Sequence, residues 1–313
     1  MLNRSPTGTR PPGFVFLGYA TRMTRRNRVW LAVALCVAAS IATPLAQRPS
    51  REACEIITPV RPVPGVREAS SLALSRRFPR RLFTLNDSPQ QLDLIVLGLD
   101  GVVRGRVRLQ NAAITDWEDL TAGPCPGGTC LYVGDIGDNT RRRTTISVYR
   151  LLEPKDGDTH AVAERFDATF PDGPHDAEAM FLGPNGRLYL LTKDARGTRL
   201  YAWPGALTRA RAQLEFVAAL AIKGDKGRFS RITDAEQSLD GKTVALRTND
   251  TLYLVPAAEL ILGDLTHARE MSLKRLNEPQ GEGVALGQNG DVFLAGEGGS
   301  RSLDGSFAQL RCQ

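Results

Sequence analysis

The sequence predicts an all-β protein: a β-propeller of four-stranded antiparallel blades, with five blades preferred and six possible. Three observations support this prediction. Short β-rich runs such as residues 188–191 and 291–294 are bounded by turn residues, helical periodicity is nearly absent, and one pattern recurs at intervals of about 50 residues. Repeated four-stranded units are typical of propeller blades, which stack around a central channel. An irregular β-sandwich is the alternative.

The repeat aligns on a glutamate that precedes a short strand, a turn and a second strand. The five glutamates are spaced by 50, 60, 58 and 46 residues, and they are Glu68, Glu118, Glu178, Glu236 and Glu282. The last unit, residues 282–313, is short for four strands, so residues 56–63 at the N-terminal end are expected to supply its outer strand and close the ring. A sixth, degenerate unit within residues 153–174 is the alternative to five blades.

Residues 1–46 are predicted to be a leader and signal peptide, followed by a single propeller domain at residues 47–313. Arginines precede an apolar run at residues 29–42, and small residues follow it. The run is shorter than the ~20 residues that cross a bilayer, so an uncleaved anchor is the less favoured alternative. We therefore expect an exported protein, periplasmic or secreted, with no membrane span in its mature chain.

The charge balance gives no support for a nucleic-acid partner, and none is expected. The formal net charge is +6, but residues 1–46 hold six arginines and no acidic residue, so the rest of the chain is neutral. Signature motifs of the commonest serine hydrolases, metalloproteases and nucleotide-binding proteins are absent from the sequence. We expect a monomer whose partner is a small anionic ligand or substrate.

The cysteines predict two disulfides. Loss of Cys36 with the signal peptide leaves four, an even number that is typical of exported chains. Cys125 and Cys130 bracket a short Pro-Gly-Gly-Thr loop, and Cys54 and Cys312 lie near the two ends of the mature chain. The simplest of the three pairings therefore joins Cys125 to Cys130 and Cys54 to Cys312. Four free thiols are the alternative, and a metal site is disfavoured because no histidine has ligand spacing with them.

The candidate site is the central channel. The inner strand of each propeller blade lines the channel, so the repeat glutamates are expected to converge. The second strands end in polar residues expected at one mouth, namely Asp87, Asp135, Asp138, Lys193, Arg247 and Glu297. Oxygen ligands alone favour a hard divalent cation, calcium above all. The predicted metal ligands are Glu68, Asp87, Glu118, Asp135, Asp138, Glu178, Glu236, Glu282 and Glu297.

Two interpretations of this mouth stay open. In the first, a cation polarises the scissile carbonyl or phosphoryl oxygen of a small anionic ester or lactone; Glu178 or Asp138 acts as base, and Lys193 or Arg247 holds the anionic group. In the second, the chain is a non-catalytic propeller that binds a ligand or protein, and the basic residues form a salt-bridge plug or the ion is structural.

Residues 134–139, Gly-Asp-Ile-Gly-Asp-Asn, form the most specific short motif. Its glycines allow a tight loop in which Asp135 and Asp138 point to one spot, as in an ion-binding loop, although the spacing is not that of an EF-hand. The alternative is an Asx-rich turn that caps the strand. His175 is a candidate base near the mouth, with a merely hydrogen-bonded histidine as the favoured alternative.

The motifs together resemble a known group. They are residues 68–73, 86–88, 116–119, 134–139, 153–154, 176–179, 192–193, 238–241 and 280–282. In these motifs the chain resembles secreted bacterial β-propeller proteins of the esterase-like phytase and SdiA-regulated type, and more distantly the gluconolactonase-like propellers. The resemblance implies the fold and calcium more than it implies a reaction. It departs at Ser70-Ser71-Leu72, where those relatives have Ser-Gly-Leu, and no catalytic residue is carried over.

Overall fold

The computed structural model describes residues 54–78, 80–87, 92–193, 197–222, 231–299 and 303–312. The predicted signal peptide, with Cys36, lies outside the described residues, as does Ser88. Residues Glu52–Gln313 form one compact unit. Across the part of the chain that is described, no helix is both long and apolar enough to cross a membrane.

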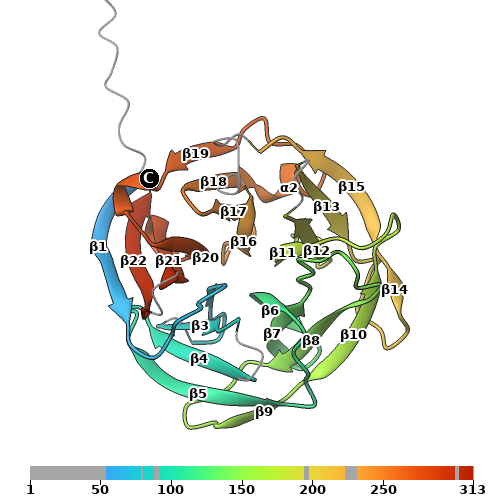
Figure 1. Cartoon of the computed structure of the whole chain (residues 1–313), viewed down its shortest axis with the longest axis horizontal. Helices are drawn as coiled ribbons and strands as arrows, with labels where there is room; N and C mark the ends of the chain where they lie inside the picture. Colours follow the sequence, from blue (N-terminus) through green and yellow to red (C-terminus); the bar gives the residue numbers. More distant parts are fainter. Residues whose placement is uncertain are drawn as a thin grey trace, which may run out of the picture. The chain divides into compact units, whose positions relative to one another are not determined.

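Five mainly antiparallel sheets surround a central axis, which confirms the five-bladed β-propeller (Figure 1). Blade 1 contains β2 (Ala73–Leu74), β3 (Arg81–Leu85), β4 (Asp93–Gly98) and β5 (Val103–Gln110). Blade 2 contains β6 (Trp117–Cys125), β7 (Gly128–Asp135), β8 (Ile146–Leu152) and β10 (Glu164–Thr169). Blade 3 contains β11 (Ala177–Leu182), β12 (Leu188–Thr192), β13 (Thr198–Ala202) and β15 (Glu215–Leu220).

The last two blades complete the ring. Blade 4 contains β16 (Ile232–Gln237), β17 (Thr243–Thr248), β18 (Thr251–Pro256) and β19 (Arg269–Ser272). Blade 5 contains β20 (Gln280–Leu286), β21 (Asp291–Glu297), β22 (Gly305–Cys312) and β1 (Cys54–Val63). Short helical turns are α2 (Ala257–Leu260), η2 (Lys274–Leu276) and η3 (Gln288–Gly290).

Ring closure follows the prediction. β1 pairs antiparallel with β22, from Cys54 opposite Cys312 to Val63 opposite Gly305. The N-terminal strand therefore supplies the outer strand of blade 5. Both predicted disulfides are present, Cys54–Cys312 at this closure and Cys125–Cys130 at the hairpin between β6 and β7.

Residues 153–174, the alternative sixth unit, do not form a blade of their own but link blades 1 and 2. They form β9 (His160–Val162), which pairs in parallel with β5, and then β10 of blade 2. In the same way β14 (Ala212–Gln213), from the connection between β13 and β15, pairs in parallel with β10. Both sheets thus gain a fifth strand from the next blade along the chain.

The burial pattern explains the blades. Inner strands such as β11 and β16 are buried at every residue because both of their faces pack on neighbouring blades. The outer strand β5 instead alternates between exposed residues and partly or fully buried ones. Trp117 is fully buried in the hydrophobic cluster between blades 1 and 2.

Candidate functional site

The inner strands are irregular at one end of the channel. The pairing with the second strand skips a residue between Trp117 and Asp119, between Ala177 and Ala179, and between Ile232 and Asp234; β20 shows a similar shift. Such β-bulges re-aim the extra residue. The residues in these bulges include Glu118, Glu178, Thr233 and Glu282.

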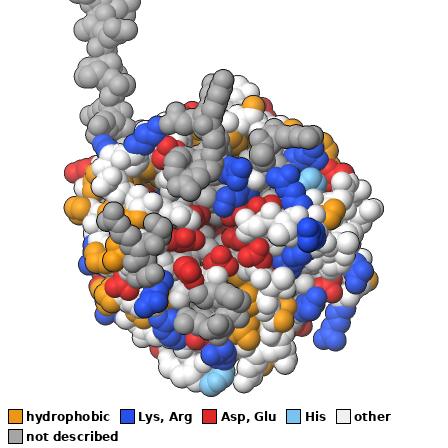
Figure 2. All heavy atoms as spheres, in the orientation of Figure 1, with side chains coloured by type: hydrophobic (Ala, Val, Ile, Leu, Met, Phe, Trp, Pro, Cys, Tyr) orange, Lys and Arg blue, Asp and Glu red, His pale blue; other side chains and the backbone are white. Residues whose placement is uncertain are grey.

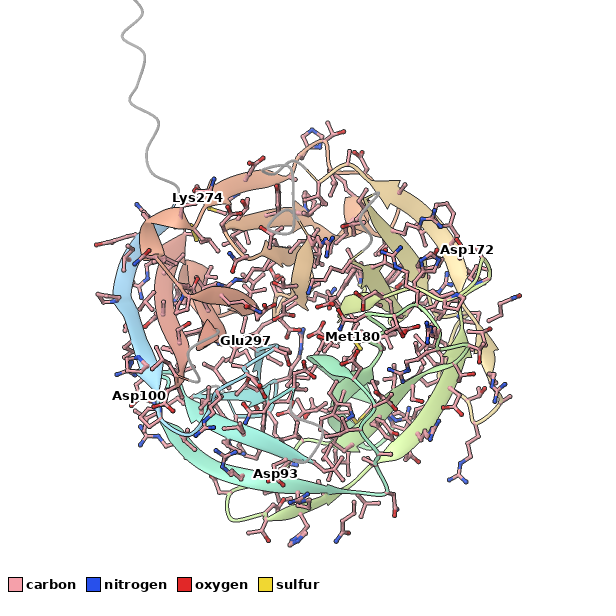
Figure 3. The ribbon with its side chains drawn as sticks, in the orientation of Figure 1. Asp93, Asp100, Asp172, Met180, Lys274 and Glu297 are labelled. Atoms are coloured by element: carbon pink, nitrogen blue, oxygen red, sulfur yellow. A yellow bond between two sulfur atoms is a disulfide. The ribbon has the colours of Figure 1, made fainter. Side chains whose placement is uncertain are left out.

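Acidic side chains gather at this end, which we call the acidic mouth and define as Glu68, Asp87, Asp116, Glu118, Asp176, Glu178, Glu282 and Glu297. Figure 2 shows acidic side chains around the centre of the face in view, and Figure 3 places Glu297 close to the axis. Six of the nine predicted metal ligands belong to this mouth. Asp116 and Asp176 were not predicted as ligands, although they stand two residues before predicted glutamates.

Three carboxylates of the mouth form a compact group. Asp87, Asp116 and Glu118 each offer an oxygen, and these oxygens lie within 4.8 Å of one another. Gly137 packs against this group: a Cβ atom there would lie 2.4 Å from Glu118 Oε1 and 2.6 Å from Asp116 Oδ2. A larger residue at position 137 would therefore displace the carboxylates of Glu118 and Asp116.

Burial and mutual repulsion raise the pKa values of these three carboxyl groups. Burial, reinforced by Asp116 and other nearby carboxylates, raises the pKa of Asp87 to about 7. Burial also raises the pKa of Asp116, and raises that of Glu118 well above its usual value. A divalent cation among the three would reverse these shifts, because it favours the ionised form of each carboxyl. The donor set, oxygen only and anionic, fits a hard cation such as calcium.

Lys193, which follows β12 of blade 3, also lies at the mouth. Its Nζ is 2.7 Å from Glu178 Oε2, and its side chain is 23% exposed. Burial lowers the pKa of Lys193, but Glu178 and Glu282 outweigh it and raise that pKa above its usual value. Burial raises the pKa of Glu178 to about 7, although Lys193 opposes the shift. Burial raises the pKa of Glu282 to about 8. Burial and the nearby Glu68 carboxylate also raise the pKa of Glu297.

The loop at residues 134–139 uses its aspartates internally. Asp135 Oδ1 accepts hydrogen bonds from the backbone of Thr115 and Asp116, and its Oδ2 lies 3.1 Å from Arg143. Asp138 accepts hydrogen bonds from the Thr140 hydroxyl and the Arg143 backbone. These contacts fit the Asx-rich turn. The ligand roles of Asp135 and Asp138, and the role of Asp138 as a base, stay predictions.

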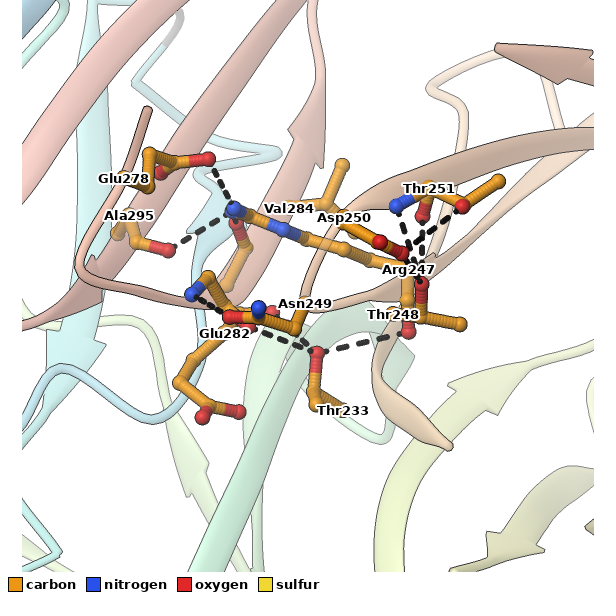
Figure 4. Close-up of polar contacts among 12 residues, drawn as sticks. Thr233, Arg247, Thr248, Asn249, Asp250, Thr251, Glu278, Glu282, Val284 and Ala295 are labelled. Atoms are coloured by element: carbon orange, nitrogen blue, oxygen red, sulfur yellow. Dashed lines mark hydrogen bonds and ion pairs between the residues drawn. The ribbon is translucent and has the colours of Figure 1, made fainter. Parts of the chain in front are cut away.

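The prediction that Arg247 holds an anion at the mouth is wrong. Its side chain is 0% exposed, and its guanidinium lies 2.5 Å from Glu278 Oε2 and 2.8 Å from the Ala295 carbonyl oxygen (Figure 4). It also donates to the Gly283 carbonyl. Arg247 therefore ties β17 to the strands of blade 5, behind the bulge that carries Glu282.

Glu236 lies further down the channel than predicted. Its carboxylate accepts a 2.6 Å hydrogen bond from the Thr121 hydroxyl, and burial raises its pKa to about 8, with Arg76 opposing. Arg76 donates to the backbone carbonyl oxygens of Ala122 and Gln237 at 2.8 and 2.9 Å. Arg76 thus bridges three blades at the end opposite the mouth, and Glu236 belongs to this closed end.

Between the two ends, two buried aspartates join the blades. Asp119 accepts a hydrogen bond from the Met180 backbone, and Asp234 accepts from the backbones of Leu72 and Val284 at 3.1 and 2.6 Å. Burial raises the pKa of Asp119 well above its usual value and that of Asp234 to about 7. These aspartates were not predicted as channel residues with a structural role.

His175 is a hydrogen-bonded histidine, which was the favoured alternative to a catalytic base. Its Nε2 lies 3.0 Å from both Asp172 Oδ1 and the Tyr201 hydroxyl, and its ring packs edge-on against Phe170. Asp172 lies toward the outside of the ring in Figure 3. These contacts describe a histidine anchored between blades 2 and 3.

No family model and no curated protein matches the sequence. Among solved structures, the chain is similar to the PQQ-bound aldose sugar dehydrogenase from Streptomyces coelicolor, with a TM-score of 0.48, 11% identity, and coverage of 83% of this chain and 98% of that one. A gluconolactonase from Xanthomonas campestris has a TM-score of 0.41, 13% identity, and coverage of 74% and 69%. A streptogramin B lyase has a TM-score of 0.43, 10% identity, and coverage of 83% and 97%.

At sequence identities this low, the structural neighbours assign no reaction, metal or substrate to this chain. The resemblance to gluconolactonase-like propellers is not decided by a neighbour of this similarity. The closer resemblance, to esterase-like phytase and SdiA-regulated proteins, stays a prediction.

Proposed function

We propose that this protein is an exported propeller hydrolase that binds a hard divalent cation, calcium, at its acidic mouth and cleaves small anionic esters or lactones. The observation that carries the proposal is the group formed by Asp87, Asp116 and Glu118, whose oxygens lie within 4.8 Å of one another. Its charge and its oxygen-only donors suit calcium. The two disulfides fit the oxidising compartment that the predicted signal peptide implies.

A bound cation would supply Lewis-acid polarisation of a carbonyl or phosphoryl oxygen. The chain itself supplies the remaining groups. Glu178 has a pKa of about 7, so near neutral pH it can accept a proton from water, as a general base must. Lys193 is partly exposed beside it and is the one predicted anion-holding residue that the structure leaves at the mouth.

The second candidate is a non-catalytic binding propeller. The observation in its favour is the Lys193–Glu178 ion pair at 2.7 Å, with Glu282 also near Lys193. In that case Lys193 neutralises part of the mouth and closes the channel as a plug. The two candidates differ in whether the mouth turns over a substrate.

The test is hydrolysis of a panel of lactones and phosphate monoesters by the protein, with and without calcium. We expect calcium-dependent turnover that Glu178→Gln lowers by a factor of about 10² to 10⁴, the usual contribution of a general base. Asp240→Asn, at an exposed turn far from the mouth in sequence and contacts, serves as the control. Turnover that survives Glu178→Gln unchanged would remove Glu178 from the mechanism, and no turnover across the panel would favour the binding propeller.

A further inference from the structure

A cavity lies in blade 1, at the end of β3 opposite the acidic mouth. Its volume is about 700 Å³, which is in the range of small-molecule sites. It is lined by the segment before β3 that contains Phe78, by the β4–β5 hairpin, and by residues 155–159 that lead into β9. Asp100, in its wall, lies at the outer edge of the ring (Figure 3). We call this cavity the blade 1 groove.

Positive charge exceeds negative charge in the groove. Its charged lining residues are Arg80, Arg81, Arg104, Arg106 and Lys155 on the basic side and Asp100, Asp156 and Asp158 on the acidic side. The groove therefore carries an excess of two positive charges, in a chain that is neutral outside residues 1–46. A dianion would balance this excess.

The excess resides on specific side chains. Asp156 pairs with Arg81, and Asp100 pairs with Arg104 at 2.7 Å, so these charges cancel. Arg80 and Lys155 are exposed, and within the described chain their side chains make no hydrogen bond or ion pair. Their charges are available to a ligand.

Two other basic residues complete the charged wall. One nitrogen of Arg106 donates to the Gly65 carbonyl at 2.6 Å, so part of this guanidinium is already engaged. Burial lowers the pKa of Arg81, although Glu153 and Asp158 oppose the shift. An anion in the groove would oppose that shift.

The groove also has space beside these charges. Gly105 of β5 lines it, and apart from its chain neighbours no heavy atom of the described residues lies within 4 Å of the Cβ position there. Val96, Leu97 and Val107 give it an apolar floor. A ligand with a charged end and a small uncharged body would therefore contact both the basic residues and this floor.

We propose that the blade 1 groove binds the phosphate group of a small phosphate ester. A phosphate monoester carries nearly two negative charges at neutral pH, which matches the excess in the groove. Arginine side chains recognise phosphate oxygens through paired N–H donors, and lysine adds a point charge. The site is separate from the acidic mouth and stands without the proposed hydrolysis.

The experiment is a calorimetric titration of glycerol 3-phosphate into the full chain in the presence of a chelator, with glycerol as the uncharged probe. We expect binding of glycerol 3-phosphate and none of glycerol. The double variant Arg80→Glu/Lys155→Glu and the variant Gly105→Phe, which fills the groove, should each weaken binding at least tenfold. The control Arg209→Glu/Arg211→Glu makes the same charge change at two exposed residues of another blade and should leave binding unchanged.

Three results would overturn the proposal: absence of binding to any phosphate probe, equal losses in the two charge-reversal variants, or loss on mutation of the mouth by Asp116→Asn. Vesicles of phosphatidic acid and of phosphatidylcholine distinguish the source of the phosphate. Binding to phosphatidic acid alone that the groove variants abolish would assign the phosphate to a lipid headgroup, whereas binding to glycerol 3-phosphate assigns it to a soluble ester. A melting temperature within a few degrees of wild type shows that each variant is folded.

Discussion

Lys193 and Arg247 come from the second strands of neighbouring blades, yet their surroundings are opposite. Lys193 follows β12, is partly exposed and pairs with Glu178 at the acidic mouth. Arg247 lies inside β17, is fully buried and pairs with Glu278, which precedes β20 of blade 5. The pairing of strands explains the difference: Leu191 faces Ala179 in blade 3, and Arg247 faces Asp234 in the corresponding place of blade 4.

Arg247 therefore occupies a core position that leucine fills in blade 3. A positive side chain just after the second strand, as at Lys193, can take part in chemistry at the mouth. A positive side chain two positions earlier, as at Arg247, packs in the core. This difference makes direct predictions, because removal of each cation should affect a different property of the protein.

The largest effect is expected from Arg247→Met. It leaves the Glu278 carboxylate buried without its partner, so the free energy of unfolding should fall by about 3–5 kcal/mol in denaturant titrations. The double variant Arg247→Met/Glu278→Leu should recover most of that loss, because a buried ion pair can be replaced by apolar side chains. A single-variant loss below about 1 kcal/mol would contradict the structural role.

The acidic mouth should make the calcium-free protein less stable as pH rises from about 5 to 8. In the unfolded chain carboxyl groups have ordinary pKa values near 4, whereas in the folded chain Asp87 and Glu178 reach about 7 and Glu282 about 8. Between these values the folded state binds more protons, so the free energy of unfolding falls with increasing pH.

Melting temperatures at pH 5, 6, 7 and 8, with chelator and with calcium, check this dependence. Calcium should flatten the decline, because a bound cation stabilises the ionised carboxylates. Stability that rises over this pH range in the chelator-treated protein would show that the mouth is already neutralised by basic residues.

Lys193→Gln should change ion binding more than folding. Removal of a positive charge beside the mouth should tighten calcium binding roughly tenfold, equivalent to about 1.4 kcal/mol, which is a modest Coulomb term at this range. Calorimetry on wild type and variant measures the ratio, and Lys242→Gln, on an exposed turn, is the matched control. Unchanged affinity would place the ion out of reach of Lys193.

The smallest effect is expected from Glu236→Gln at pH 6. Its pKa of about 8 keeps the carboxyl protonated there, and glutamine can still accept the Thr121 hydrogen bond. The free energy of unfolding should change by less than about 0.5 kcal/mol, as for a neutral substitution. A loss of several kcal/mol at pH 6 would show that Glu236 is ionised and held by Arg76.

The fold could be predicted from the sequence because it depends on local, repeated signals. Turns such as Asp240-Gly241, short buried strands and the cysteines at both ends of the mature chain indicate blades and their closure. The acidic mouth was predictable to the extent that repeat glutamates mark inner strands. Asp116 could have been included, since it stands in the same acidic motif as Glu118.

The exact positions in the channel could not be predicted, because β-bulges shift the alternation. The Asp-Ala-Glu triplet that ends at Glu236 resembles the triplet that ends at Glu178, so the two glutamates align in sequence. In the structure Thr233, not Glu236, takes the place of Glu178 in the bulge. Glu236 then lies three residues further along β16, where Thr121 and Arg76 surround it.

The most direct test of the central claim is a calorimetric titration of calcium into chelator-treated protein, paired with melting temperatures. We predict binding with a dissociation constant at or below ~1 mM, as in extracellular calcium modules, and a higher melting temperature; at a hundredfold excess over that constant the stabilisation is about 2.7 kcal/mol. Asp116→Asn should abolish both effects, and Asp138→Asn should leave calcium binding intact. No heat and no shift in the wild-type protein would contradict the cation site and leave the salt-bridged binding propeller.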